Sequence, residues 1–305
     1  MMDYKALASL HAVLMFQSFD KAANYLNLTQ SAVSQNIKRL EHRCGRPLLI
    51  RARPVVATPL GEKMLAHFNK VSMLEDGLQN DLNGGVASQP ISIAINNDSL
   101  ATWFTQVMEQ FSKQQNTKLH IKAADQAHTR QLLQKGEVIA CLSDIGSPVS
   151  GGGSSFLGNM HYELVATQDF IDNYINNSID NHIANNLRDS LEVKAIIQSR
   201  ALVYDEHDEL WSRYQSECLN IQADTRNSHW YPSSHGFVEL VMGGTVCALV
   251  PSIQIQDQLK ENALVSLFPD KKLALPLYWH WYKLNSPVLD QLTNVIRTVT
   301  KNTLY

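Results

Sequence analysis

The sequence has no long apolar run. No stretch approaches the roughly 20 consecutive apolar residues that a membrane-spanning helix needs. The first residues, MMDYKALASLHAVLMF, include an acid and polar residues instead of the basic start and clean apolar core of an export signal. We therefore expect a cytoplasmic protein with no membrane partner.

Cysteine is scarce. The four cysteines, Cys44, Cys141, Cys218 and Cys247, are far apart, and none belongs to a Cys-x-x-Cys pair. This spacing argues against a zinc knuckle and a disulfide framework. A redox-sensing pair brought together by folding stays open, although a lone cysteine usually packs as a small hydrophobic side chain.

The common catalytic motifs are also missing. We find no Gly-x-Ser-x-Gly elbow, no His-Glu-x-x-His and no Gly-x-x-x-x-Gly-Lys phosphate loop. The 11 histidines are scattered without metal-ligand spacing. We expect a protein that is not an enzyme and needs no cofactor or metal.

The small net charge of −3 conceals an uneven distribution. The first 70 residues carry ten Lys/Arg and four acids, whereas the other 235 carry 16 Lys/Arg and 25 acids. A basic segment on an acidic body favours contact between the N-terminal part and a polyanion.

Three short segments near the N-terminus show helical spacing of apolar residues. Ser18 is a suitable N-cap for the second segment. The third opens at Thr29 or Gln30 and is expected to end near His42. In the third, Val33 and Ile37 point inward, so its polar residues point outward.

That outward face suits DNA. Gln can bond adenine in the major groove, Ser can reach a phosphate or base edge, and Lys can meet guanine or phosphate. The candidates are Thr29, Gln30, Ser31, Ser34, Gln35, Lys38 and Arg39. Residues 47–58 then predict a two-stranded wing with Arg51 and Arg53 near its tip, where they could enter the minor groove or bind phosphates. The alternative is a small helical domain with an ordinary polar face.

Residues 20–61 read DKAANYLNLTQSAVSQNIKRLEHRCGRPLLIRARPVVATPLG and resemble the LysR-type transcriptional regulators. The matching positions are Ala22-Ala23, Leu28 to Ser34, Ile37 to Glu41, Gly45, Pro47 to Leu49, Arg51, Thr58 and Gly61. The resemblance implies a sequence-specific DNA-binding transcription regulator with a winged helix-turn-helix over residues 1–58.

A long helix is expected from Thr58-Pro59, with Thr58 as N-cap and Pro59 at its first position. An apolar stripe follows at Leu60, Met64, Phe68, Val71, Leu74, Leu78 and Leu82. The stripe either packs in the same domain or pairs with a second chain, and we favour the pair. The resemblance likewise implies a dimerisation helix over residues 59–83.

After a Gly/Ser/Pro-containing break at 84–90, which we expect to be a hinge, strands and helices alternate. Strands are expected at 91–95, 119–123, 138–142, 201–204 and 246–250, with helices from Ser99 to about Phe111 and around Thr129–Lys135. Such alternation predicts an α/β domain with a mostly parallel sheet, in which ligands bind beyond the carboxyl ends of strands.

The resemblance implies that residues 91–305 form an effector-binding domain like a periplasmic solute-binding protein. Subdomain I would cover about 91–165 and 277–305, and subdomain II about 166–276. The chain would cross near Val165–Asp169 and return near Leu277–Tyr282, with the effector cleft between the subdomains.

The segment from Asn96 to Trp103 lies where the first strand of this domain ends and a helix begins. Free backbone N–H groups there favour a carboxylate, and Ser99 and Thr102 add hydroxyls, with Leu100 between them. The alternative is that Ser99 is a plain N-cap.

Asp98 to Trp103, Gly136-Glu137-Val138 and Leu277 to His280 resemble the arginine- and lysine-responsive branch of the family. The resemblance implies lysine or arginine as effector. A basic amino acid needs an acid for its cationic side chain, and the candidates are Asp125, Asp144 and Asp205. The sequence departs from the branch at Gln126, His128 and His235, where the branch has acids and an arginine, and in the segment 144–156.

Further candidates lie near the expected cleft. Ser234 opens a helix that faces the cleft, and His128 and His235 could make the response pH-sensitive. The aromatic run Tyr278 to Tyr282 is either core packing or a cage for a cation. Gly243-Gly244 is expected to form a helix C-cap turn.

We expect as partners double-stranded DNA, a small-molecule effector, a second copy through the long helix, further copies in a homotetramer, and RNA polymerase. Two rival functions are a transport-type solute-binding protein and a nucleoid-type DNA binder without sequence preference. The missing export signal and the basic head argue against the first, and the salt dependence of binding would test the second.

Overall fold

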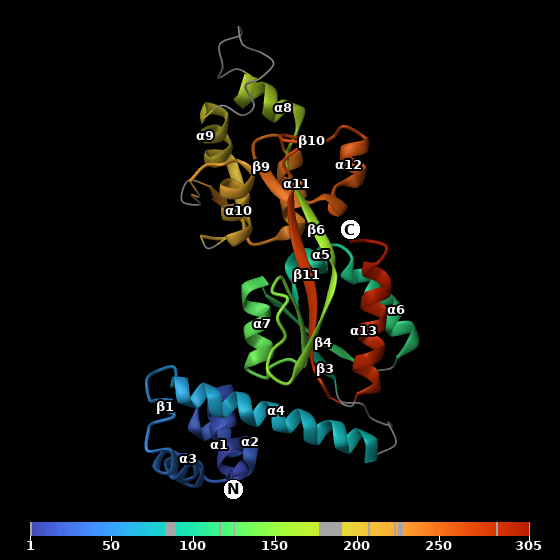
Figure 1. Cartoon of the computed structure of the whole chain (residues 1–305). Coiled ribbons are helices and arrows are strands. Elements are labelled where there is room, and N and C mark those ends of the chain that lie inside the picture. Colours follow the sequence, from blue (N-terminus) through green and yellow to red (C-terminus); the bar gives the residue numbers. More distant parts are fainter. Residues whose placement is uncertain are drawn as a thin grey trace.

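The computed structural model describes residues 2–82, 90–115, 117–124, 126–176, 191–206, 208–222, 224, 228–284 and 286–304. A small N-terminal head, a long helix and a larger α/β part follow one another along the chain (Figure 1). Asp125 and nearly all of the expected hinge at 84–90 lie outside the described residues.

The head has the expected winged arrangement. It consists of α1 (Tyr4–Phe16), α2 (Phe19–Leu26), α3 (Gln30–Cys44) and a hairpin of β1 (Leu49–Ile50) with β2 (Val56–Ala57). The Ser18 hydroxyl accepts a hydrogen bond from the Lys21 amide, so the expected N-cap of α2 is confirmed. Of the two expected starts of α3, Gln30 is its first residue, and Thr29 caps it by accepting a hydrogen bond from the Ala32 amide. A single apolar cluster that includes Val33 forms the core of the head.

The long helix α4 (Pro59–Leu82) begins where the Thr58-Pro59 pair predicts. Thr58 Oγ1 accepts a 3.1 Å hydrogen bond from the Gly61 amide, which closes the N-terminus of the helix. The two ends of the apolar stripe on α4 have different surroundings. Leu60, Met64 and Phe68 pack against the head core, whereas Leu74 is 56% and Leu78 60% exposed.

A nine-stranded mixed sheet runs through the rest of the chain in the order β4-β3-β5-β11-β6-β9-β7-β8, with β10 beside β6. Its strands are β3 (Ile91–Asn96), β4 (Leu119–Ala124), β5 (Ala140–Ser143), β6 (Gly152–Ala166), β7 (Ala201–Val203), β8 (His229–Trp230), β9 (Cys247–Pro251), β10 (Val265–Ser266) and β11 (Leu273–Tyr282). The β3-β4, β3-β5, β7-β8 and β7-β9 pairs are parallel, as the strand–helix alternation predicts. The sheet is mixed and not mostly parallel as expected, because the pairs that β6 and β11 make with each other and with β5, β9 and β10 are antiparallel.

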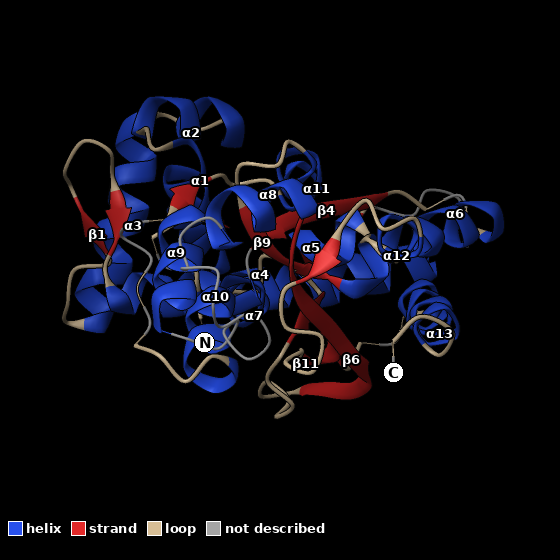
Figure 2. Cartoon of the chain, turned by 90° about the horizontal axis from the view of Figure 1, so that it is seen from above, coloured by secondary structure: helices blue, strands red, loops and turns tan. Residues whose placement is uncertain are grey.

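Helices cover both faces of the sheet. They are α5 (Asn97–Ala101), α6 (Phe104–Gln114), α7 (Gln126–Gln134), α8 (Gln168–Phe170), η1 (Ile171–Ile175), α9 (Leu191–Arg200), α10 (Glu209–Arg213), η4 (Tyr214–Cys218), α11 (Ser234–Met242), η5 (Ser252–Gln254), α12 (Gln256–Lys260) and α13 (Pro287–Thr300). Both views place α6 and α13 on one side of β6 and β11, and α7 on the other (Figures 1 and 2). Among the described residues, no helix is long and apolar enough to cross a membrane.

The two long antiparallel strands β6 and β11 join two halves of the sheet (Figure 1). We call the part with β3, β4, β5, α5, α6, α7 and α13 the first half, and the part with β7 to β10 and α9 to α12 the second half. Trp281 of β11 pairs with Ala140 in the first half, whereas Val165 of β6 pairs with Ala248 in the second. Residues Tyr162 to Val165, at the C-terminal end of β6, pair with β9 of the second half. The domain boundaries themselves stay predictions.

The helix expected from Ser99 to about Phe111 is in fact two helices, α5 and α6. Asn96, and not Ser99, occupies the N-cap position of α5. Thr102 Oγ1 donates a 2.6 Å hydrogen bond to the Asp98 carbonyl, and the Thr102 backbone leaves the helical region there. The break turns Trp103 and Phe104 into the core, where both are buried.

Candidate functional site

The outward face of α3 carries the polar residues expected to read DNA. Gln30, Ser31, Gln35 and Lys38 are exposed and Ser34 is half-buried. Thr29 uses its hydroxyl to cap the helix. A helix that presents its N-terminal residues in this way has the geometry of a recognition helix for the major groove.

The arginines of the head differ in their surroundings. Arg39 donates to Asn36 Oδ1 at 2.8 Å and lies 3.2 Å from Asp3, so it also helps to join α3 to α1. Arg51 lies 3.6 Å from Glu41, whose other oxygen accepts from the Leu48 amide and thereby fixes the hairpin to α3. Arg53 is exposed in the turn between β1 and β2.

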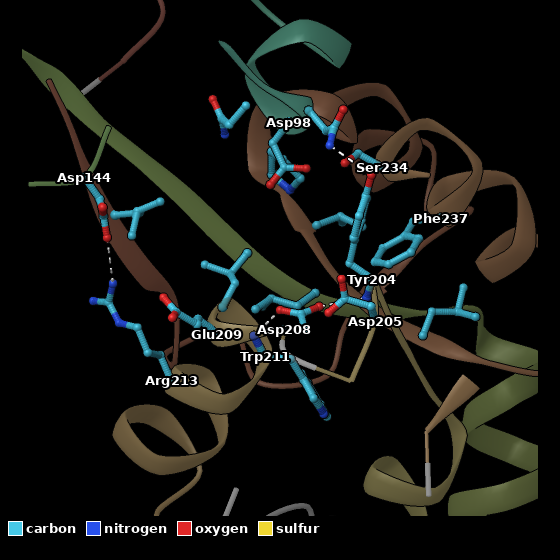
Figure 3. A pocket seen from close by; sticks show the side chains of 18 of the residues that line it. Asp98, Asp144, Tyr204, Asp205, Asp208, Glu209, Trp211, Arg213, Ser234 and Phe237 are labelled. Atoms are coloured by element: carbon cyan, nitrogen blue, oxygen red, sulfur yellow. Dashed lines mark hydrogen bonds and ion pairs between the residues drawn. The ribbon is translucent and has the colours of Figure 1, made fainter. Parts of the chain in front are cut away.

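A cavity of about 170 Å³ opens between the two halves (Figure 3). One ordered water needs only about 10–15 Å³ by a similar measure, so the cavity has room for a small organic molecule. Acids dominate its charged lining, which consists of Asp98, Asp144, Asp205, Asp208, Glu209, Arg213 and His128. The lining comes from both halves, as the carboxyl-end rule for parallel strands predicts.

Asp98 lies on α5, directly after β3, and is hydrogen-bonded across the cleft. Tyr162 of β6 donates its hydroxyl to Asp98 Oδ2 at 2.7 Å, and the Asp98 carboxylate is also hydrogen-bonded to the Ser234 side chain of α11. Burial raises the pKa of Asp98, while these two hydrogen bonds oppose the rise. Next to it, Asn97 Nδ2 donates to the Tyr204 hydroxyl at 2.9 Å. The first half is therefore joined to the second by side chains at the mouth of the cavity.

Asp208 is the N-cap of α10. Its two oxygens accept from the Trp211 amide at 2.9 Å and the Tyr204 amide at 2.8 Å. Burial is the main reason that the pKa of Asp208 is raised, and the charges of Asp98 and Asp205 add to the rise. The effect of these two charges on Asp208 indicates that the three carboxyl groups share one electrostatic environment.

Arg213 and Asp144 face each other at one side of the cavity, with 3.9 Å between Nη1 and Oδ2 (Figure 3). Arg213 Nε also donates to Glu217 at 3.0 Å. The guanidinium is thus balanced by two carboxylates, and the charge of the lining stays negative.

The structure brings together some of the residues expected to bind an effector and not others. His128, Asp144, Asp205 and Ser234 line the cavity. Ser99, Leu100, Thr102 and His235 are not among the lining residues, and Asp125 lies outside the described residues.

The reason differs between these residues. Ser99 is fully buried within α5, Leu100 packs against the main core, and Thr102 uses its hydroxyl inside its own turn. His235 is exposed one residue beyond Ser234, on a different face of α11. Because α5 begins at Asn97, two residues earlier than expected, Asp98 and not Ser99 reaches the cavity.

Asp98, Asp208 and Glu209 were not assigned a role from the sequence. A usable signal was present, because the acidic run that begins at Asp205 directly follows the expected strand at 201–204. Ligands in parallel sheets bind beyond the carboxyl ends of strands. If this rule is applied to the whole acidic run and not only to Asp205, Asp208 and Glu209 also become candidate ligand-binding residues.

The aromatic run at the end of β11 is core packing. Trp279 is fully buried and donates its indole N–H to Thr293 of α13 at 3.0 Å. His280 is also fully buried and is bonded to the Ile145 carbonyl at 2.7 Å through Nε2. None of the residues in the run lines the cavity, so they form no cage around a ligand there.

All four cysteines are free thiols. Burial raises the pKa of Cys141 and of Cys247 to about 12. Such thiols are poor nucleophiles and poor redox sensors. The expected turn at Gly243-Gly244 is confirmed, since Gly243 is the C-cap of α11 and Gly244 has a φ of +76°.

Comparisons with known proteins agree with this architecture. Residues 4–62 match the family described as "Bacterial regulatory helix-turn-helix protein, lysR family". The HTH-type transcriptional regulator ArgP of Pseudomonas aeruginosa is 36% identical over 294 residues, which are 95% of this chain and 93% of that protein. The crystal structure of ArgP from Mycobacterium tuberculosis is similar over 100% of this chain and 99% of that one, with a TM-score of 0.83 and 29% identity. Full-length LysG from Corynebacterium glutamicum with bound effector Arg is similar over 99% of both chains, with a TM-score of 0.76 and 28% identity.

Proposed function

The chain belongs to the LysR family of transcription regulators, in the branch of ArgP, and on that premise we propose that its effector is a basic amino acid held in the cavity between the two halves. Its relatives are regulators and not enzymes. Binding of arginine by the similar LysG protein supports the proposal.

The charge of the cavity is the observation that carries the proposal. Five carboxyl groups line it, against one arginine and one histidine. Gathering so many acids in one cavity is unfavourable unless cations or protons neutralise them. Arginine carries an ammonium, a guanidinium and a carboxylate and so has a net charge of +1. Asp205, Asp208 and Glu209 of the second half are the proposed acceptors for its two cationic groups.

A second observation supports a ligand N–H group in the cavity. Asn96 is 2% exposed and lines the cavity, and its Oδ1 accepts no hydrogen bond from the described residues. A buried carbonyl oxygen without a donor costs free energy. An ammonium or guanidinium group of the ligand would donate to it.

Titration with amino acids at fixed pH, followed by thermal unfolding, tests the proposal. L-arginine and L-lysine should raise the midpoint temperature of unfolding by mass action. L-citrulline, which has the shape of arginine without the positive charge of the side chain, should not. Asp205→Asn should weaken the arginine shift, and Asp257→Asn, which removes an 85% exposed carboxylate on α12, serves as the matched control. Equal shifts with citrulline and arginine would contradict a charge-reading site.

We further propose that the head reads DNA through Gln30, Ser31, Ser34, Gln35 and Lys38 of α3, with Arg53 of the wing on the backbone or in the minor groove. Exposure of these side chains on one face supports this assignment. Thr29, Arg39 and Arg51 would contribute phosphate contacts beside their structural roles. DNase footprinting of an operator found by selection, with single-residue variants, tests each residue.

The assembly is also part of the proposal. The exposed Leu74 and Leu78 of α4 would pair with a second copy, and dimers would join through the sheet halves into a homotetramer that bridges two DNA sites. Such a regulator would act in the cytoplasm, where DNA and RNA polymerase are. Sedimentation that finds only monomers at micromolar concentration would contradict the assembly.

A further inference from the structure

Arg213 is the only arginine or lysine that lines the cavity within the described part of the chain. It lies in the last turn of α10, one helical turn after Glu209, which also lines the cavity. Figure 3 shows its side chain reaching toward Asp144 of the first half. The function proposed so far gives this arginine no role in binding.

The guanidinium of Arg213 keeps one edge without a hydrogen bond. Its Nε donates to Glu217 at 3.0 Å, whereas Nη1 lies 3.9 Å from Asp144 Oδ2, which is beyond hydrogen-bond distance. Among the described residues, Nη1 and Nη2 donate to no acceptor. The two nearby carboxylates therefore offset the charge of Arg213 but leave free the flat pair of nitrogens with which an arginine binds both oxygens of a carboxylate.

The other place expected for a ligand carboxylate offers no cation. The sequence predicts that the start of the helix after β3 receives it, with the hydroxyls of Ser99 and Thr102. Neither of these residues lines the cavity, and Asp98 lines it instead. An acid there gives an anionic group nothing to pair with. Figure 3 shows Asp98 and Arg213 in different parts of the cavity, so a carboxylate at Arg213 is away from Asp98.

The charges at α10 are separated by sign along the helix. Asp208 is its N-cap and Glu209 its first residue, and Asp205 comes just before them. Arg213 lies four residues after Glu209, about 6 Å further along the helix axis. A basic amino acid is built in the same order, because methylene groups separate its side-chain cation from its α-ammonium and α-carboxylate.

We propose that Arg213 is the specificity-determining residue that binds the α-carboxylate of the effector, so that the cavity selects basic amino acids over basic amines without a carboxylate. This inference rests on the proposed function, since it takes a cationic ligand in the same cavity as its premise. The ligand lies along α10, with its side-chain cation at Asp205 and Asp208 and its carboxylate on the free edge of Arg213.

A double-mutant cycle in which the ligand carries one of the two changes tests this contact. L-argininamide keeps both cationic groups of arginine and replaces the carboxylate by an uncharged amide. Isothermal titration calorimetry of the full chain, at one pH where both α-amines are protonated, gives the dissociation constants. We define the selectivity ratio as the dissociation constant of L-argininamide divided by that of L-arginine.

Arg213→Gln should lower the selectivity ratio by about tenfold or more, the size expected for a hydrogen bond between charged groups. Arg213→Lys keeps the positive charge without the flat pair of nitrogens and should lower the ratio by a smaller factor. It also serves as the second variant in case Arg213→Gln does not fold. An unchanged ratio in both variants would overturn the inference.

Arg130→Gln is the matched control. Arg130 carries a guanidinium that donates to the Ser147 carbonyl, three residues from Asp144, but it does not line the cavity. Its loss should change the selectivity ratio by less than about threefold, as the loss of a partly screened charge does. Equal changes in Arg130→Gln and Arg213→Gln would overturn the inference, because the effect would then belong to the net charge and not to a contact.

Failure of this inference differs from failure of the proposed function. If arginine binds the parent and the selectivity ratio does not respond to Arg213→Gln, the inference is overturned and the proposed function stands. If neither arginine nor argininamide binds the parent, the proposed function is overturned, and the inference is overturned with it.

Discussion

The Tyr162 hydroxyl donates a 2.7 Å hydrogen bond to Oδ2 of Asp98, 64 positions away in the chain. Tyr162 belongs to the strand that crosses between the halves, and Asp98 belongs to the short helix at the mouth of the cavity. The bond therefore joins the strand that crosses between the halves to the helix that lines the cavity.

Tyr162→Phe removes this bond and leaves a buried carboxyl group with one donor fewer. We expect the variant to lose about 1–3 kcal/mol of unfolding free energy, because Tyr162 is fully buried and its partner is a carboxylate. Urea denaturation measures the loss. Tyr25→Phe, at a 58% exposed position, is the control and should change stability by less than about 0.5 kcal/mol. Equal stability of the two variants would show that the bond contributes nothing.

The free energy of unfolding should depend on pH through the titration of Asp98. Burial raises the pKa of this carboxyl group above its unfolded value, so the folded state holds the proton more tightly. The associated stability is fully present below the unfolded pKa, near 4, and is lost as the pH rises through the folded pKa.

Asp98→Asn should therefore flatten the fall in unfolding free energy above pH 4, measured by urea denaturation at several pH values. Asp257→Asn corrects for the change in net charge at an exposed position. Parallel pH curves for the parent and Asp98→Asn would disagree with a buried titrating group at this site.

Gln35→Ala should weaken binding to the selected operator by about 1–3 kcal/mol and relax the preference at one base pair, because a bidentate contact reads a single adenine. Fluorescence anisotropy with a set of single-base operator variants measures both effects. Gln106→Ala, at an exposed position of α6, is the control. An unchanged base preference would remove Gln35 from the reading set.

Leu78→Asp should weaken the dimer at least tenfold, about 1.4 kcal/mol, because a carboxylate would replace an apolar side chain in the proposed pair of α4 helices. Sedimentation velocity across a dilution series measures the dissociation constant. Ile145→Asp places the same charge on another exposed apolar position, 48% exposed against 60%, and should leave the dimer intact. Equal dissociation constants would move the interface away from α4.

The head could be predicted in detail because its signals are local. The N-cap hydroxyl of Ser18, the Thr58-Pro59 start of α4 and the apolar spacing each act within a few residues, and all were found where the sequence places them. The parallel strands were recognisable for the same reason, since each is a short apolar run.

The course of the chain between the halves could not be predicted, because β6 begins in Gly152-Gly153-Ser154-Ser155, which has no apolar alternation. Pairing with β11, far away in the sequence, makes this segment a strand. The identity of the cavity acids likewise depends on where α5 begins. Because α5 begins two residues earlier than expected, Asp98 lines the cavity in place of Ser99. The position of a helix start is set to that precision by packing, here of Trp103 and Phe104.

The continuous crossing strands also impose an order on the synthesis of a working molecule. The core of the head lies within the first 68 residues, so it can close while the rest of the chain is still on the ribosome. The sheet cannot close in the same way, because β11, which pairs with both β5 and β6, is among the last segments made. The DNA-binding head can therefore fold before the part that regulates it has been made, and a chain interrupted between the two would keep the head and lack the effector cavity.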